Sequence, residues 1–497
     1  MDSNLKRIFL ATIISFLFFA LYDYFVFAPN MQNSNTTTET QPKKEVQKET
    51  ISKINHKVVA TIKSKNYIAK IDELGRISSF VLREDKFNKE GVHLELISKK
   101  LPKPLEIRFE DENLNSQAFS KEVEVDKSEV FVDSPKTITI TQKLSNLIIK
   151  KVVTFYPSGR YDLKIFLSRP VKYYISNGYR PEAVIDQLTI HGALIKKDDG
   201  VLEIIEDGDA KIETIKKAII VAGFDRYYTT LLFSKEPFSV VVSMDEEKNP
   251  ITFIQSNKNL NLIGYIGPKY VDVLRKIDLN LVDVVQYGVG TFFARNLFLV
   301  LDMFYKLVHN WGVAIILLVV LVRIVLFPLT FKGMVSMYKL KELAPKMKEI
   351  QEKYKKDPQK LQMHMMKLYK EHGANPLGGC LPLILQIPVF YGIYKLLLYA
   401  IELKGVHFLW ISDLSEMDPY FILPILMGAT MYLHQRLTPT NFQDPMQEKV
   451  FKFLPLIFTF MMATFPAGLV LYWTVNNILS VIQQVIINKI MEAKVKK

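Results

Sequence analysis

The residue whose type and position most clearly suggest a functional role is Arg323, which interrupts the otherwise apolar run from Trp311 to Phe331. At about 1.5 Å per helical residue, Arg323 would lie roughly 18 Å below Trp311, near the middle of a hydrocarbon core about 30 Å thick. A charged side chain at that depth costs from about 3 to more than 10 kcal/mol, so it usually faces a bundle interior or a wet cavity. The chemistry that it offers is attraction of an anionic group, with no bond made or broken.

The other apolar runs in the second half of the chain contain no carboxylate that could neutralise Arg323; they are roughly residues 377–401, 421–436, 450–465 and 468–489. Asp23, in the first apolar run, is predicted near the opposite membrane face. An arginine without a counter-ion predicts a hydrated cavity, whose acidic partner arrives with a ligand or substrate. The alternative is an arginine bonded to backbone carbonyls where helices pack.

A polar stripe on the last apolar run is the second candidate feature. Its members follow the spacing i, i+4, i+7 and i+11, which places them on one helical face: Trp473, Asn477, Ser480 and Gln484. We expect this stripe to line the same cavity as Arg323, although interhelical hydrogen bonding alone would explain it equally well. In a wet cavity, positive charge should matter more than guanidinium geometry, so Arg323→Lys should keep much activity.

Residues for covalent, redox or metal chemistry are not visible in the sequence. The single cysteine, Cys380, excludes an intramolecular disulfide, and no Cys/His spacing resembles a zinc site. There is no GxxxxGK[ST] nucleotide-binding loop. An intramembrane hydrolase would need a nucleophile and a base, but His309, His407 and His434 fall at the ends of predicted spans. We therefore expect no enzymatic activity, no metal and no cofactor.

A secondary transporter is the alternative function, since it too would use a charge at the membrane midplane. Such proteins usually carry interrupted apolar segments at matching places in two halves of the chain, and no such pair is present here.

The charge balance indicates a membrane protein. The 497 residues carry a formal net charge of +13, which first suggests a nucleic-acid partner. The lysines, however, concentrate beside apolar runs, where they mark cytoplasmic loops. We therefore expect contact with a lipid bilayer and no direct binding of nucleic acid.

The first 285 residues divide into three predicted parts. Residues 1–28 form an uncleaved signal-anchor helix, because an apolar run of 20 residues, 8–27, follows Lys6 and Arg7 without a cleavage site. Residues 29–55 are polar and aperiodic, as in a flexible linker. From 56 to 285, short β-branched and aromatic runs such as VVATIKS and YDLKIFL alternate with turn residues, which predicts a β-sandwich.

Two amphipathic elements flank the first core span. Residues 286–310 include the run 292–309, whose charged residues share a narrow arc, as in a helix lying in the membrane interface. Residues 332–375 are rich in lysine and carry apolar residues at alternating spacings of three and four, broken at Asp357-Pro358. This pattern predicts a cytoplasmic helical hairpin, which is compatible with ribosome contact.

The complete prediction is a helical membrane core, residues 311–490, with five spans and one N-terminal anchor span. The tail 491–497 returns to the inside, so both termini would be cytoplasmic.

Five ordered blocks between about 290 and 490 resemble the YidC/Oxa family of membrane protein insertases: VRIVLFPLTFKGM, LAPKMKEIQEKYKKDPQKLQ, NPLGGCLPLILQIPVFYGIY, DPYFILPILMGAT and FPAGLVLYWTVNN. The anchor followed by a large β-domain is similar in layout to the Gram-negative bacterial form. The resemblance implies a periplasmic β-supersandwich domain and location in the bacterial inner membrane.

The same resemblance implies a function. Members of the family move nascent transmembrane segments into the lipid, alone or beside the Sec translocon, and act without a cofactor. Arg323 would face a hydrophilic groove that is open to the cytoplasm, and the 332–375 hairpin would receive the substrate. The family's hydrophobic exit surface comes from its third and fifth spans, which gives four candidate residues by position: Ile387, Phe390, Phe458 and Met462.

Overall fold

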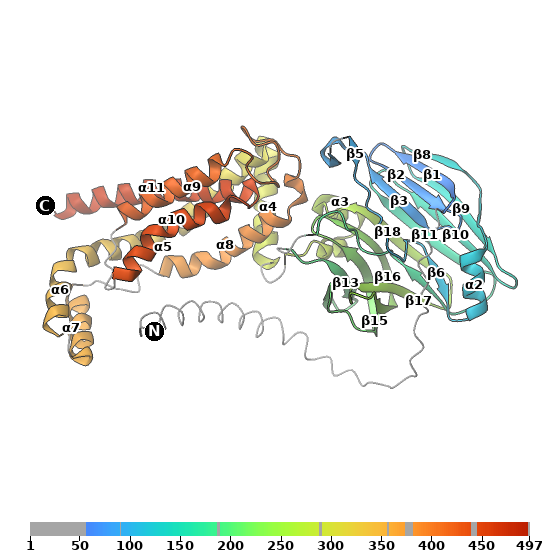
Figure 1. The fold of residues 1–497 in the computed structure, drawn as a ribbon, viewed down its shortest axis with the longest axis horizontal. Coiled ribbons are helices and arrows are strands. Elements are labelled where there is room, and N and C mark those ends of the chain that lie inside the picture. The colour runs from blue at the N-terminus through green and yellow to red at the C-terminus, as the bar shows by residue number, and fades with distance from the viewer. Residues whose placement is uncertain are drawn as a thin grey trace.

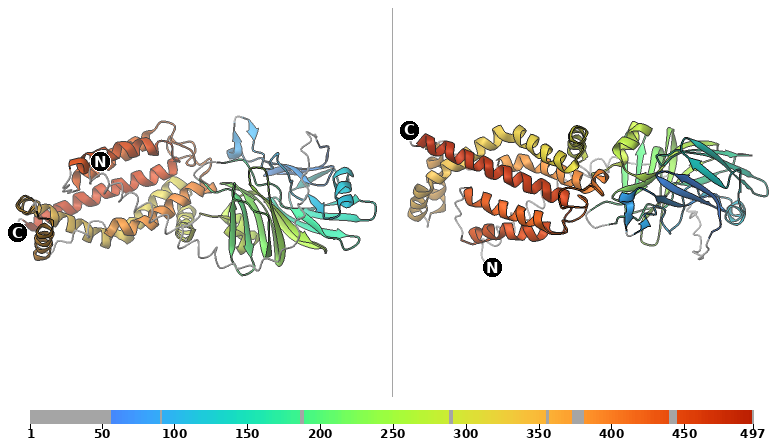
Figure 2. Two further views of the ribbon diagram at one scale, coloured as in Figure 1. Left: turned by 60° about the horizontal axis from the view of Figure 1, so that its bottom comes forward. Right: turned by 90° about the horizontal axis from the view of Figure 1, so that it is seen from above.

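The computed structural model describes residues 56–89, 91–185, 189–287, 291–354, 357–372, 381–438 and 445–495. A β-domain and a helical half lie end to end along the long axis of the molecule (Figures 1 and 2). The predicted anchor, 1–28, and linker, 29–55, fall outside the described residues.

The larger sheet of the β-domain follows one antiparallel path: β14 (Leu202–Glu206), β13 (Gly192–Lys197), β15 (Glu213–Phe224), β16 (Tyr228–Met244), β18 (Leu260–Pro268), β11 (Arg160–Leu167), β10 (Ile148–Phe155), β9 (Lys136–Lys143) and β7 (Glu124–Val125). Beside it, β17 (Pro250–Ser256) pairs with β16 and with β12 (Tyr173–Ser176), which also pairs with β6 (Ile107–Phe109). Burial alternates along β9 and β11, as expected for strands with one face on a core.

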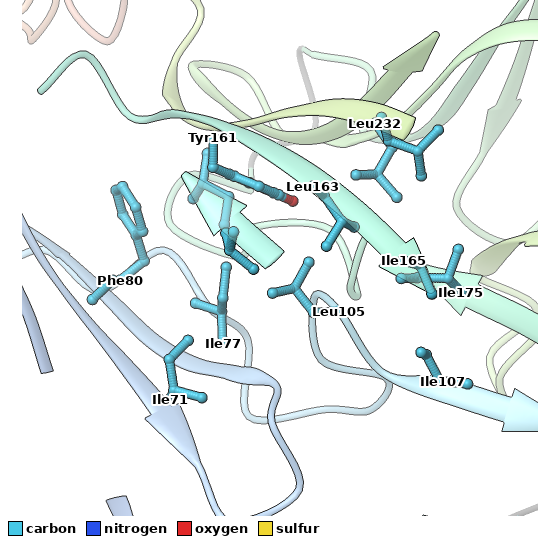
Figure 3. Packing of buried hydrophobic residues seen from close by; sticks show 14 of the residues in the cluster. Ile71, Ile77, Phe80, Leu105, Ile107, Tyr161, Leu163, Ile165, Ile175 and Leu232 are labelled. Carbon is cyan, nitrogen blue, oxygen red and sulfur yellow. The ribbon is translucent and has the colours of Figure 1, made fainter. Parts of the chain in front are cut away.

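A smaller sheet packs over the larger one. Its strand order is β3 (Ile77–Leu82), β2 (Tyr67–Asp72), β1 (Val58–Ser64) and β8 (Glu129–Val132), with β8 parallel to β1. Side chains from both sheets meet in one apolar core, where Phe80 and Ile71 face Tyr161 and Leu163 of β11 (Figure 3). This arrangement is a sandwich, with small additions: the hairpin β4 (Asn88–Lys89) and β5 (Val92–His93), the 3-10 turn η1 (Asp85–Phe87) and helix α2 (Glu112–Ser120).

A short helical segment leads from the sandwich to the helical half. It consists of α3 (Val271–Ile277), the 3-10 turn η2 (Leu279–Val284) and α4 (Thr291–Val308). Arg295 of α4 donates a hydrogen bond to Asp283 of η2 at 2.8 Å, which joins the two elements across residues 288–290. After a left-handed turn at His309, Asn310 caps the next helix by accepting from the Val313 amide at 3.0 Å.

The helical half contains α5 (Trp311–Glu342), α6 (Ala344–Lys353), α7 (Pro358–Glu371), α8 (Leu381–Tyr399), α9 (Ile422–Leu437), α10 (Pro445–Met462) and α11 (Ala467–Val495). A 3-10 turn, η5 (Ile401–Leu403), follows α8. Within the described residues, two helical segments are long and apolar enough to cross a membrane, Trp311–Leu340 and Ala467–Ala493.

The cytoplasmic hairpin predicted for 332–375 has different bounds in the structure. Helix α5 continues without a break through Lys332 to Glu342, so the hairpin itself consists of α6 and α7. Asp357 caps α7 by accepting from the Lys360 amide at 3.1 Å, and Pro358 occupies its first turn. Lysine-rich composition therefore did not mark the end of the long helix.

One apolar core runs without interruption from the sandwich into the helical half. It includes Leu194 and Phe224 of the β-domain, Leu281 of η2, Ala314 of α5 and Leu396 of α8. The two halves are therefore packed together, which the sequence did not indicate.

Candidate functional site

Arg323 lies on α5 where this helix packs against α11, and only 8% of its surface is exposed. Its Nε donates to the side-chain oxygen of Asn476 at 2.8 Å, and Nη2 donates to the backbone oxygen of the same residue at 2.9 Å. Nη2 also bonds the Ser480 hydroxyl, and Nη1 donates to Gln483 Oε1 at 3.3 Å. We call these four residues the Arg323 cluster.

All four hydrogen bonds of the guanidinium end on neutral oxygens. The bonds offset part of the cost of burying the group, but they do not cancel its charge. At 4 Å, a carboxylate would interact with such a charge by about 4 kcal/mol at an effective dielectric constant near 20. The cluster is therefore a fixed positive site that can attract an anionic group.

The predicted stripe divides into two faces. Ser480 belongs to the Arg323 cluster, whereas Asn477 donates to the backbone oxygen of Met427 on α9 at 3.4 Å. Gln484 donates to Asn488 Oδ1 on the same helix at 2.9 Å. Asn488 in turn donates to the backbone oxygen of Leu437 on α9 at 3.3 Å. Asn477 and Asn488 thus join α11 to α9, and these hydrogen bonds of Asn477 and Gln484 do not involve Arg323.

The partners that sequence reasoning missed are Asn476 and Gln483. Each stands beside a predicted stripe residue, in the pairs Asn476-Asn477 and Gln483-Gln484. Adjacent helical residues point about 100° apart, so spacing alone does not tell which member of a pair faces Arg323. The set 476, 480 and 483 has the spacing i, i+4 and i+7 and fits one face as well as the predicted set does.

Trp473 joins α8 to α10. Its ring lies 4.8 Å from that of Phe390 on α8 and 5.5 Å from that of Phe458 on α10, in edge-to-face geometry in both cases. Phe390 and Phe458 are therefore brought together by a predicted stripe residue that lies outside the Arg323 cluster.

The four candidate exit residues differ in exposure. Ile387, Phe390 and Phe458 are half-buried. The assignment of Met462 to the exit surface must be corrected. Its side chain is 3% exposed and packs in the core, so it does not form part of a surface in this structure. The exposed apolar side chains of α10 include others: Val450, Phe453, Leu456, Ile457, Phe460 and Met461.

Comparison with known proteins decides the family. A family model described as 60Kd inner membrane protein matches residues 303–494. A membrane protein insertase YidC from Wolinella succinogenes is 51% identical, with 98% of this chain and 95% of the relative aligned. The chain belongs to the YidC family of membrane protein insertases. The YidC proteins of Campylobacter jejuni and of Helicobacter pylori strain 26695 are each 48% identical, over 98% and 99% of this chain and 96% and 97% of their own.

The family model covers the Arg323 cluster, because residues 303–494 include all of α5 and all but the last residue of α11. The relatives also align over the β-domain, because they cover nearly the whole chain. Among solved structures, that of an active YidC insertase with its first transmembrane domain resolved covers 87% of this chain and 94% of its own, at 20% identity and a TM-score of 0.38.

Metal chemistry has no candidate site among the residues with described positions, since no three His, Cys, Asp or Glu side chains there form a group that could hold an ion. Cys380 lies outside those residues.

Proposed function

We propose that this chain inserts nascent transmembrane segments into the bilayer by offering their polar flanks a hydrated path past the Arg323 cluster. The observation that carries this proposal is a buried guanidinium whose four hydrogen bonds all end on neutral oxygens. Its charge remains available inside an otherwise apolar bundle. A carboxylate on the flank of a client would gain electrostatic energy there that lipid does not offer.

The energy for insertion comes from the client. Burying each apolar residue of a transmembrane segment in the bilayer is favourable by about 0.3 to 0.6 kcal/mol, so a full span needs no nucleotide. The Arg323 cluster lowers the cost of moving the polar flank, which is the barrier. In this scheme the protein acts as a chaperone and not as an enzyme, and it uses no cofactor.

The proposed topology has six spans: the anchor within 1–28, then α5, α8, α9, α10 and α11. Both termini would be cytoplasmic and the β-domain periplasmic, in the inner membrane of a bacterium. The lysines around α6 and α7 support a cytoplasmic position for the hairpin by the positive-inside rule.

The proposed client path begins at the α6–α7 hairpin, passes the Arg323 cluster and leaves between α8 and α10. The last step is supported by the aromatic row Phe390, Trp473 and Phe458, through which α8 and α10 both contact α11. The partners would be nascent membrane proteins and lipid, with the Sec translocon and the ribosome as further partners.

The test is site-specific photocrosslinking to nascent chains stalled at increasing lengths, together with insertion into liposomes. A crosslinker at Gln483 removes only the longest bond of the cluster and faces Arg323. A matched probe at Ile324, which is 64% exposed beside Arg323, faces away from the cluster. We expect capture of the client flank at Gln483 at intermediate lengths and little capture at Ile324. Equal capture at both positions, or solute flux without insertion, would contradict the proposal.

A further inference from the structure

The loop between α8 and α9 contains a two-residue hairpin turn with a leucine at its tip. Phe408 and Ile411 exchange two backbone hydrogen bonds, both at 2.9 Å, so Leu409 and Trp410 are the central residues of the turn. Leu409 has a left-handed backbone, with φ of 54°, and its side chain is 76% exposed. Glycine or asparagine usually fills such a position, because a Cβ makes the left-handed conformation unfavourable. Neither the backbone conformation nor packing within the chain therefore favours leucine here.

The turn is fixed to the first residues of α5 and α9. The Phe408 ring lies against Gly312 of α5, where an added Cβ would come within 2.1 Å of a ring atom. Trp410 Nε1 donates to the buried Asp418 carboxylate at 3.1 Å. The same carboxylate accepts from the amide of Leu423, in the first turn of α9, at 2.7 Å. The turn consequently lies at the level where these two helices begin.

The same loop is also joined to the start of α11. The amides of Ala467 and Gly468 donate to the carbonyls of Glu416 and Leu414, at 2.7 and 2.9 Å. Leu414 is fully buried in the apolar core that includes the helical half. In the proposed topology α5, α9 and α11 all begin on the periplasmic side. The loop is thus held at the periplasmic face of the bilayer by three helices.

Exposed apolar and aromatic side chains continue from this loop onto α9. The Tyr420 amide donates to Asp418 at 3.0 Å, and Phe421, which precedes α9, is a second left-handed residue, with φ of 56°. Both of their side chains are exposed. Ile425, one turn into α9, is 61% exposed on a proposed membrane span. Aromatic residues are enriched at the membrane–water interface, where their rings contact both lipid and water.

We infer that the 408–411 turn is a lipid-binding site, at which Leu409 inserts among the acyl chains just below the headgroups of the periplasmic leaflet, beside Tyr420 and Phe421. Lipid is the partner because three helices hold the turn at the bilayer face and its surroundings are continuous with the exposed face of α9. Burial of the leucine in lipid offsets its unfavourable backbone conformation. The inference rests on the proposed topology and requires neither the client path nor the β-domain.

The first experiment measures the position of Leu409 in the full chain. A bimane fluorophore is attached to Leu409→Cys in a Cys380→Ser background, in vesicles of phosphatidylethanolamine and phosphatidylglycerol. The quenchers are iodide in the water and lipids that carry a nitroxide either near the headgroup or near the chain end. Ile425→Cys is the reference for a site on a span. Phe131→Cys is the aqueous reference, because Phe131 is 64% exposed on β8 of the sandwich.

We expect the Leu409→Cys fluorophore to be quenched most by the nitroxide near the headgroup, and severalfold less by iodide than the fluorophore at Phe131→Cys. Iodide quenching equal to that at Phe131→Cys, while Ile425→Cys is quenched by lipid, would overturn the inference and leave the topology standing. Absence of lipid quenching at Ile425→Cys would overturn the topology and this inference with it.

The second experiment separates lipid binding from a purely structural role of the turn. Asparagine is similar in size to leucine and tolerates the left-handed conformation, whereas methionine keeps both the apolar surface and the backbone penalty. A structural role alone predicts that Leu409→Asn slows hydrogen exchange across residues 404–421, or leaves it unchanged. Lipid binding predicts the opposite sign in nanodiscs, a rise of about tenfold, from the loss of one buried leucine side chain.

Leu409→Met should exchange like the unaltered protein, and Phe131→Asn should leave residues 404–421 unchanged. Exchange in Leu409→Asn that is no faster than in Leu409→Met would overturn the inference. An equal rise in Leu409→Asn and Phe131→Asn would overturn it as well, because the effect would then not be specific to the turn.

Discussion

Arg323 on α5 donates through Nε to the side-chain oxygen of Asn476 on α11 at 2.8 Å. Because the backbone oxygen of Asn476 accepts from the same guanidinium, one residue holds two of its nitrogens. This contact fixes both the depth and the orientation of the buried charge.

Asn476→Ala should reduce insertion of clients with acidic flanks by about tenfold, since a hydrogen bond to a charged group contributes about 1.5 to 3 kcal/mol. Asn477→Ala is the matched control, because the side-chain amide of Asn477 donates to the Met427 carbonyl on α9. Insertion of a client series that differs only in flank charge measures the effect. Equal losses for acidic and neutral flanks in Asn476→Ala would show that Asn476 supports the fold and not the charge.

Arg323→Lys should lose most of the activity toward acidic flanks, although its charge is kept. The guanidinium bonds three residues through three nitrogens, and a single ammonium cannot reach all of them. This expectation is the opposite of the one drawn from the sequence, which did not indicate these fixed partners. The same client series in liposomes, at equal protein levels, decides between the two, and near-normal insertion by the lysine variant would support the original expectation.

The sequence was sufficient for the elements with strong periodicity or a strong apolar signal. Alternation along β9 and β11 predicts a sandwich, and the apolar run after Trp311 predicts a long helix with Arg323 inside it. The five family blocks also identified the insertase core, because they occur together and in the family's order between about residues 290 and 490.

The sequence could not supply contacts that depend on rotation about a helix axis or on distant packing. Asn476 and Asn477 differ by one position, and only the packed neighbours decide which faces α5. The hydrogen bond from Arg226 Nε to the Leu398 carbonyl spans 172 positions, and a backbone carbonyl carries no side-chain signal. The burial of Met462 likewise depends on how α10 is rotated.

Gly428→Ala should separate α9 from α10. A Cβ at this position would lie 1.9 Å from Thr459 Oγ1, so either one helix must shift or Thr459 must rotate and lose its 2.8 Å hydrogen bond to the Pro455 carbonyl, at a cost of about 1 to 3 kcal/mol for an overpacked contact. Thr459→Ala removes that oxygen and leaves Cβ as the next atom, at 3.2 Å. Thermal unfolding of both single variants and the double variant measures the coupling. If the double variant is no more stable than Gly428→Ala, the contact does not limit the packing.

Lys269→Met should remove part of the pH dependence of β-domain stability. Burial lowers the pKa of Lys269 from its ordinary value of 10.5 to about 8, while its ammonium donates to the Asp225 backbone oxygen at 2.8 Å. Between pH 8 and 10.5 the unfolded chain binds more protons than the folded chain. The contribution of this group to the free energy of unfolding therefore rises with pH there, by roughly 3 kcal/mol at most.

The measurement is thermal unfolding of the full chain in detergent, followed by the β-sheet circular dichroism signal across that pH range. Lys269→Met should show a smaller rise than the unaltered protein. Parallel curves for the two proteins would mean that Lys269 does not titrate in this range.

The α6–α7 hairpin should open far more readily than the membrane helices, because its own core is small. Its buried apolar side chains are Leu343, Met347, Met365 and Leu368. Met365 is 7% exposed, whereas its neighbour Met366 is 61% exposed. Removing a buried methionine side chain costs about 2 to 5 kcal/mol, which is comparable with the stability such a short hairpin can have.

Met365→Ala should therefore raise hydrogen exchange across residues 344–372 by at least about tenfold, while Met366→Ala should leave it nearly unchanged. Mass spectrometry of the full chain in nanodiscs resolves this region from α11, which serves as the slow reference. A client that binds the opened hairpin should slow exchange there in the unaltered protein. Exchange in the hairpin as slow as in α11 would contradict its proposed role as the mobile receiving element, and equal responses of the two variants would show that the small core does not hold it closed.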